Sequence, residues 1–188
     1  MALMKKLFLS CIAVLAVTAC ATVQTENKDS EKQQNPACGC AKRVKRNVNP
    51  DPAQYEAYAQ KGTGEISGRL CGTDVNGKNK ICLRKQMVVL NPVTDYSTEW
   101  YVRYWTNNES LEEAHEIAKK HNKIVYTGKK GEFSFKELPA GEYYIGGAFC
   151  PGNIKFKTKE AEYKYSRYGV KVTVGEGETK RVVLEKVF

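Results

Sequence analysis

The sequence predicts a mainly β fold: a two-sheet antiparallel sandwich of about seven strands over residues 63–188, with one α-helix inserted near 110–121. Three observations predict it. From about Gly64 the chain becomes a series of short runs in which apolar and polar residues alternate. Turns rich in Gly and Pro separate these runs. The region is about 125 residues long, which is the usual size of two sheets packed face to face.

Four runs predict strands in the first half of this region, because each is short, rich in apolar residues and bounded by turn residues. They span residues 65–70, 81–90, 99–105 and 123–127. The second contains Met87–Leu90, which is apolar enough for a central strand, and the third alternates around Trp100, Val102 and Tyr104.

The second half of the region shows turns and strands with defined faces. Gly128–Gly131 predicts a hairpin turn, after which Phe133 and Phe135 share one face. Pro139–Gly141 predicts another turn, which leads into an apolar run at 143–145. A closing pair of strands follows, with a turn at 175–177 between them. Val170, Val172 and Val174 share one face of the first strand, and Val182 and Leu184 belong to the second, which closes the fold.

One segment breaks the β pattern and predicts the inserted helix. Ser110 and Glu113 have the spacing of a capping box, in which each side chain accepts a hydrogen bond from the other residue's backbone. Apolar residues then recur at helical spacing, and Lys119, Lys120 and His121 suit the negative end of the helix dipole. We therefore expect a helix of about three turns that packs on the sandwich.

Residues 1–19 have the pattern of a secretory signal peptide. Lys5 and Lys6 precede an uncharged, mostly apolar run at 7–19, which is too short to span a membrane as a helix. Val17–Cys20 then resembles the bacterial lipobox, an aliphatic residue and two small residues before an obligatory Cys. The resemblance implies cleavage before Cys20 and acylation of its thiol. The alternative is an ordinary signal peptide that leaves Cys20 unmodified.

Acylation would anchor the protein to a lipid bilayer without a transmembrane helix, since two or more acyl chains hold a protein stably. Ala21 follows the Cys, whereas an Asp at that position signals inner-membrane retention in many Gram-negative lipoproteins. The sequence therefore favours a cell membrane lipoprotein of the outer membrane. It leaves open whether the protein faces the periplasm or the cell surface.

Residues 20–62 are expected to be the lipidated Cys followed by a flexible tether. Residues 25–36 are almost entirely polar and cannot bury enough apolar surface to fold. The basic cluster at 41–46 is either a solvated linker or a contact to anionic head groups. One short helix is expected over 51–60, capped by Asp51 with Pro52 at its first position.

Five of the seven cysteines remain after signal cleavage and lipidation, and export permits disulfides. Cys71 and Cys82 lie at the facing ends of two predicted strands, so we expect them to form a disulfide. Cys150 could pair with Cys38 or Cys40. The C-x-C spacing of the latter two is not a redox motif, and without a matched second pair we expect no metal site.

The stretch Thr127–Ile145 resembles the signature of carboxypeptidase regulatory-like domains, which belong to the transthyretin-like (prealbumin-like) β-sandwiches. The resemblance rests on Thr127, Gly131, the F-x-F of 133–135, the L-P-x-G of 138–141 and Tyr143. Residues 65–70, 88–90 and 170–184 match the family's other strands, so the resemblance covers about residues 64–188 with the helix as an insertion. It implies a folding and binding module that is not itself a peptidase.

No residue pattern predicts catalysis or a cofactor. The chain has two His, and His115 and His121 lie about 240° apart around the predicted helix, so they do not converge. The sequence contains no H-E-x-x-H, G-x-S-x-G or Walker motif.

A basic and aromatic stretch predicts a binding surface instead. The chain carries 30 Lys and Arg against 21 Asp and Glu, a net charge of +9. The candidate binding residues are Lys155, Phe156, Lys157, Lys159, Lys164, Tyr165 and Arg167. Such residues suit an anionic glycan or an acidic envelope protein, and an exported protein is not expected to meet nucleic acid. The alternative is a solvated loop whose lysines protect an edge strand.

Two function classes follow from these features. The first is a membrane-anchored lipoprotein that acts as a non-enzymatic binding or structural module of the cell envelope. The alternative is an inhibitor or assembly factor for a hydrolase or for a secretion or pilus complex.

Overall fold

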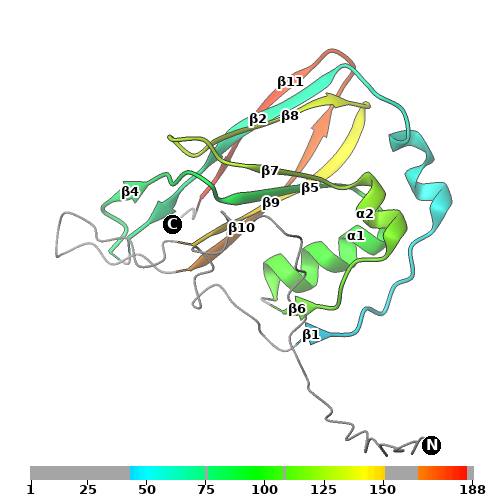
Figure 1. Ribbon diagram of the computed structural model, residues 1–188, viewed down its shortest axis with the longest axis horizontal. Helices are drawn as coiled ribbons and strands as arrows, with labels where there is room; N and C mark the ends of the chain where they lie inside the picture. The colour runs from blue at the N-terminus through cyan, green and yellow to red at the C-terminus, as the bar shows by residue number, and fades with distance from the viewer. Residues whose placement is uncertain (1–42, 75, 108, 151–164, 186–188) are drawn as a thin grey trace, which may run out of the picture. The chain divides into compact units, whose positions relative to one another are not determined.

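The computed structural model of the chain describes residues 43–74, 76–107, 109–150 and 165–185. Within these ranges, seven strands form two sheets that face each other, with helices α1 and α2 outside the four-stranded sheet (Figure 1). The four-stranded sheet has the order β10 (Ser166–Val174), β9 (Gly141–Phe149), β5 (Met87–Pro92), β7 (Lys123–Tyr126). The three-stranded sheet has the order β11 (Thr179–Leu184), β2 (Gly64–Leu70), β8 (Glu132–Leu138). The predicted mainly β sandwich is confirmed.

The core lies between the two sheets, because every second side chain of each strand points inward. The three-stranded sheet contributes Ile66, Leu70, Phe133, Phe135, Leu138 and Leu184, and the four-stranded sheet contributes Val88, Leu90, Tyr143, Ile145, Phe149 and Val174. Val170, Val172 and Val182 pack against this core from its margins. The faces that alternation predicted for Phe133, Phe135 and the closing strands are therefore confirmed.

The expectation of a wholly antiparallel sandwich is wrong for one pair of strands. β11 pairs with β2 in parallel, whereas β2–β8, β5–β7, β5–β9 and β9–β10 are antiparallel. The cause is that the turn at 175–177 carries the chain from one sheet to the other. The turn at Gly128–Gly131 likewise joins β7 to β8 across the sandwich, so neither turn closes a hairpin within one sheet.

The inserted helix is shorter than predicted and begins later. α2 spans Glu116–His121, and His115 is its N-cap, with its Nδ1 accepting from the amide of Ile117 at 3.3 Å. The expected capping box does not form, because Ser110–Leu111 is strand β6 and pairs in parallel with β1 (Arg43–Val44). Backbone pairing therefore occupies the residues that were expected to begin the helix.

The prediction of a strand over residues 99–105 is wrong. This part of the chain is α1 (Asp95–Trp100) followed by a π-helical segment, η3 (Tyr101–Thr106). Thr94 caps α1: its side chain accepts from the Ser97 amide, and the Ser97 side chain accepts from the Thr94 amide. The two helices present aromatic rings to the outer face of the four-stranded sheet, and this contact outweighs the β preference of the aromatic residues.

The prediction of a flexible tether up to residue 62 is wrong for residues 43–62, because these residues pack against the rest of the body. The 3-10 helix η2 spans Pro52–Tyr58, and Asp51 caps it by accepting from the Ala53 amide at 3.0 Å, as predicted. Tyr55 on this helix is 2% exposed and packs with Tyr96 and Ala118. Packing of these apolar side chains explains why the segment is ordered.

The predictions for the signal peptide, for the acylation of Cys20 and for the polar run at 25–36 lie outside the described residues. Among the helices that the structure does describe, none combines the length and the apolar character needed to span a bilayer.

The predicted disulfide between Cys71 and Cys82 is confirmed. It joins the two ends of the short hairpin formed by β3 (Gly72–Thr73) and β4 (Lys80–Ile81). Cys150 is also disulfide-bonded. Cys38 and Cys40, its expected partners, lie outside the described residues.

We expect replacement of both Cys71 and Cys82 by serine to lower the free energy of unfolding by about 2–4 kcal/mol, because the unfolded chain gains freedom when the loop opens. Equilibrium denaturation of the double variant and the wild type measures the difference. A variant that unfolds at the same denaturant concentration as the wild type would contradict a stabilising role for this bond.

Candidate functional site

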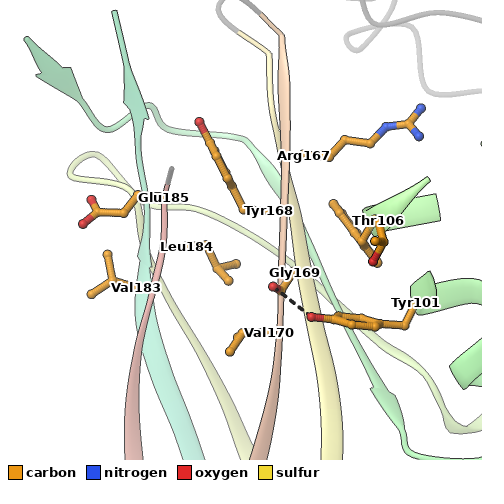
Figure 2. A pocket seen from close by; sticks show the side chains of 10 residues that line it. Tyr101, Thr106, Arg167, Tyr168, Gly169, Val170, Val183, Leu184 and Glu185 are labelled. Atoms are coloured by element: carbon orange, nitrogen blue, oxygen red, sulfur yellow. Dashed lines mark hydrogen bonds between the residues drawn. The ribbon is translucent and has the colours of Figure 1, made fainter. Parts of the chain in front are cut away.

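A pocket with a volume of about 340 Å³ lies at the edge of the sandwich beside strands β10 and β11 (Figure 2). Three segments line it. η3 contributes Tyr101, Trp105 and Thr106, β10 contributes residues 167–170, and the end of β11 contributes residues 183–185. β10 and β11 are edge strands of different sheets, so the pocket lies at the open side of the sandwich.

Glycines on the outer face of the sheet give η3 its position. A Cβ atom at Gly146 of β9 would overlap the Trp105 ring. At Gly169 of β10, a Cβ would lie 3.0 Å from both the Trp105 Cγ and the Tyr101 Cε2. Gly146 and Gly169 face each other across β9 and β10. Because neither residue has a side chain, they leave a flat surface, which we call the glycine seat (Gly146 and Gly169). The aromatic side chains of η3 pack on it.

The aromatic rings around this seat pack against one another, and we call them the aromatic cluster (Trp100, Tyr101, Tyr104, Trp105 and Tyr144). Trp105 meets Trp100 and Tyr104 edge to face, at centroid distances of 5.5 and 4.8 Å. Tyr101 stacks on Tyr144 at 4.3 Å, and its hydroxyl donates to the Gly169 carbonyl at 3.1 Å. Pairs of this kind are worth about 0.5–1.5 kcal/mol beyond burial, so the pocket wall is well fixed.

Arg167 joins β10 to the aromatic cluster. Its guanidinium carbon lies 3.9 Å from the centroid of the Tyr104 ring, and its Nε donates to the Tyr165 hydroxyl at 2.7 Å. Its Nη1 donates to the carbonyls of Tyr104 and Glu109, each at 3.2 Å. Burial, followed by the nearby Tyr165, raises the pKa of Tyr104 to about 12, so this phenol keeps its proton near neutral pH.

The polar groups of the pocket stand around an apolar centre. Figure 2 shows Tyr168, Val170 and Leu184 between β10 and β11, with Tyr101 and Thr106 on the other side of β10. Glu185 closes the far rim and forms an ion pair with Lys80. Aromatic faces combined with a few hydroxyl and charged groups suit a ligand that has both apolar and hydroxyl-bearing surfaces.

The structure brings together two of the predicted binding residues, Tyr165 and Arg167, and Arg167 lines the pocket. The other five lie outside the described residues: Lys155, Phe156, Lys157, Lys159 and Lys164. Sequence reasoning missed Tyr101 and Trp105, because it assigned their segment to a strand. Aromatic residues spaced four apart, at 96–100–104 and again at 101–105, share a helix face, and this spacing was the available signal.

The two histidines have structural positions. His115 caps α2, and the His121 ring lies 5.0 Å from the Tyr55 ring. Within the described ranges, no group of three or more His, Cys, Asp or Glu has the geometry to hold a metal ion.

A buried carboxylate connects the pocket wall to residues 43–48, which we call the strap. Glu99, 9% exposed, accepts from the amides of Asn47 at 2.7 Å and Val48 at 3.2 Å. The Nη1 of Arg103 donates to the same carboxylate at 2.9 Å and to the Lys45 carbonyl at 2.8 Å. Burial acts to raise the pKa of Glu99, but these hydrogen bonds outweigh it and hold the pKa below its ordinary value.

We expect this carboxylate to make the body sensitive to acid. Because its pKa is lower in the folded state, its contribution to stability is complete above the unfolded pKa, about 4.3, and is lost as the pH falls through the folded pKa. Denaturant unfolding between about pH 6 and pH 3 should therefore show a shallower loss of stability in Glu99→Gln than in the wild type. Equal slopes would contradict this prediction, and Glu176→Gln, at an exposed turn, is the control.

Comparisons with known proteins add evidence on the fold. No protein-family model matches the chain, and no curated protein does. A solved structure from Pseudomonas aeruginosa, provisionally described as a carbohydrate-binding protein, is 20% identical with a TM-score of 0.60. The match covers 74% of this chain and 99% of that protein.

Two Gram-positive pilins give weaker matches. A minor pilin of Streptococcus agalactiae is 18% identical with a TM-score of 0.37, over 69% of this chain and 47% of the pilin. The major pilin subunit of Bacillus cereus is 18% identical with a TM-score of 0.35, over 66% of this chain and 29% of the pilin. At such low identity, the Pseudomonas match supports the sandwich fold alone.

Proposed function

We propose that the chain is a lipoprotein of the cell envelope whose sandwich body binds a saccharide without altering it chemically. Acylated Cys20 anchors the protein, in the outer membrane of a Gram-negative envelope. The observation that carries the binding role is the pocket beside η3, β10 and β11, which is lined by Tyr101 and Trp105 on one side of β10, by Tyr168 on the other side, and by charged groups.

The chemistry of a pyranose ring matches this lining. One face of such a ring is largely C–H and packs on aromatic rings, while its hydroxyls need donors and acceptors at the edge. The Tyr168 ring and Leu184 supply the apolar contact, and Thr106 and Glu185 supply polar atoms. A volume of about 340 Å³ lies in the range of small-molecule sites. The Pseudomonas protein of similar fold carries a provisional carbohydrate-binding description, which is compatible with this proposal.

We also propose that the protein binds its ligand without catalysing a reaction. The tyrosine of the cluster with the most strongly raised pKa, Tyr104, stays protonated near neutral pH. The Glu185 carboxylate is paired with Lys80, and the Arg167 side chain is held by Tyr104 and Tyr165. Because each of these groups already has a partner within the protein, the contacts favour a role in binding over one in catalysis.

Binding to peptidoglycan sacculi and to purified lipopolysaccharide tests the proposed function. The full chain in detergent micelles should bind at least one of them, and Tyr168→Ala should weaken that binding at least about tenfold, a loss of about 1.4 kcal/mol. Tyr126→Ala is the matched control, because Tyr126 is 66% exposed and lies on β7, outside the pocket. Equal affinity of the two variants would overturn the assignment of the pocket.

The anchor needs a separate test. Cells fed a clickable fatty acid should label the wild-type protein and not Cys20→Ser, because that thiol is the expected acceptor. Equal labelling of the two proteins would contradict the lipoprotein assignment and would leave saccharide binding to be judged by its own experiment.

A further inference from the structure

The strap and the pocket both involve η3, and the strap also contacts α1. Strap residues bind Glu99 and Arg103, which belong to α1 and η3. The same η3 supplies Tyr101, Trp105 and Thr106 to the pocket. Arg103 and Trp105 are two residues apart in η3.

The strap is held by several kinds of contact. β1 pairs with β6, the Arg46 amide donates to the Glu112 carboxylate at 2.9 Å, and the Arg46 guanidinium lies 4.3 Å from the Tyr96 ring centroid. The Glu99 carboxylate accepts hydrogen bonds from the next two backbone amides of the strap, those of Asn47 and Val48. A buried carboxylate that lost these partners would retain its desolvation cost, so the strap and Glu99 stabilise each other strongly.

Arg103 and Glu109 carry the connection to β10. Arg103 contacts Glu99 through Nη1, and it contacts the Glu109 carboxylate through Nε at 2.8 Å and Nη2 at 2.7 Å. The Glu109 amide donates to the Arg103 carbonyl at 2.8 Å, and the Glu109 carbonyl accepts from Arg167. An uninterrupted series of contacts therefore runs from the strap to the pocket residue Arg167.

The helix that receives these contacts has unusual geometry. π-helical segments are rare in proteins and are frequent at functional sites. Since η3 is six residues long, its conformation depends on contacts with its surroundings. Those contacts are the glycine seat beneath it and the strap beside it.

We propose that Glu99 is a positioning residue for the pocket: by binding the strap, it fixes η3 and thereby sets the pocket wall formed by Tyr101 and Trp105. Saccharide as the ligand rests on the proposed function, whereas the coupling of the strap to η3 does not.

The chain offers a specific probe, because its two tryptophans, Trp100 and Trp105, both belong to the aromatic cluster. In the full chain, Glu99→Gln should shift the tryptophan emission of the folded protein to longer wavelength. It should also speed amide hydrogen exchange at 101–106 at least about tenfold, with exchange in β2 and β8 unchanged. Glu176→Gln, an equivalent change at an exposed turn, should change neither.

A second variant tests the same coupling from the strap. Asn47→Pro removes the amide that donates to Glu99 at 2.7 Å and leaves Glu99 intact, so it should produce the same emission shift. Unchanged emission and exchange at 101–106 in both variants would overturn the proposal. So would a shift in Glu99→Gln alone, because Glu99 would then act independently of the strap.

Saccharide binding separates the two proposals. If the wild type binds sacculi or lipopolysaccharide, Glu99→Gln should weaken that binding several-fold, and unchanged affinity would overturn the role of Glu99 in setting the pocket. If the wild type binds neither, the proposed function fails, and the emission and exchange results still decide whether the strap positions η3.

Discussion

Replacing Phe135 with alanine is expected to lower the free energy of unfolding by about 3–5 kcal/mol, the range for a large aromatic residue removed from a packed core. Phe135 is 2% exposed on β8, and it meets Phe133 at a ring-centroid distance of 5.9 Å. Its ring fills the space between the sheets, so its loss removes apolar burial and leaves a cavity. Equilibrium denaturation in urea measures the change.

Ile124→Ala is the matched control for this prediction. Ile124 is 50% exposed on β7, and its truncation should change the stability by no more than about 0.5 kcal/mol. A loss below about 1 kcal/mol in Phe135→Ala would contradict the packing of the two sheets around this residue.

Gly146→Ala is expected to have the largest effect on the pocket. The added Cβ would overlap the Trp105 ring, so η3 must move off the sheet or the sheet must deform. We expect a loss of about 1–3 kcal/mol in stability from overpacking. We also expect at least about a tenfold loss in saccharide affinity, a difference of about 1.4 kcal/mol.

Gly175→Ala provides the comparison, because the nearest atom to its added Cβ is an ordinary contact with Glu178 at 3.4 Å. It should leave both affinity and tryptophan emission unchanged. If Gly146→Ala behaves like Gly175→Ala, then η3 does not rest on β9 as described.

Much of the sandwich could be predicted from sequence, because its strands are selected by two-residue alternation. Phe133 and Phe135 point inward and Ser134 between them does not, which is the pattern of a half-buried strand. The choice of partner strands could not be predicted in the same way. Alternation is identical for parallel and antiparallel neighbours, so β11 beside β2 was not predictable from it.

Residues 95–106 show why local patterns can mislead. Aromatic residues favour strands in general, and the alternation at Trp100, Val102 and Tyr104 strengthened that prediction. The segment is helical because its rings find a glycine seat on β9 and β10, more than 40 residues further along the chain. A local sequence pattern cannot indicate a packing surface that lies so far along the chain.

Only part of the candidate site could be predicted, because its residues come from segments that lie far apart in the sequence. Arg167 and Tyr165 stood out as a basic residue beside an aromatic one, and they do lie together in the structure. The rest of the pocket depends on η3, whose helical form was missed. The strap was also missed, since nothing in residues 43–48 alone indicates that a buried Glu99 receives their amides.

The most direct test of saccharide binding at this pocket is a two-dimensional NMR titration of the full chain in detergent micelles with soluble peptidoglycan fragments and lipopolysaccharide oligosaccharide. The account predicts that one of them shifts the indole signal of Trp105 and the backbone signals of Tyr101 and Tyr168, leaves those of Phe133 and Phe135 unchanged, and is recovered chemically intact. Shifts confined to residues outside the pocket, or cleavage of the saccharide, would contradict it.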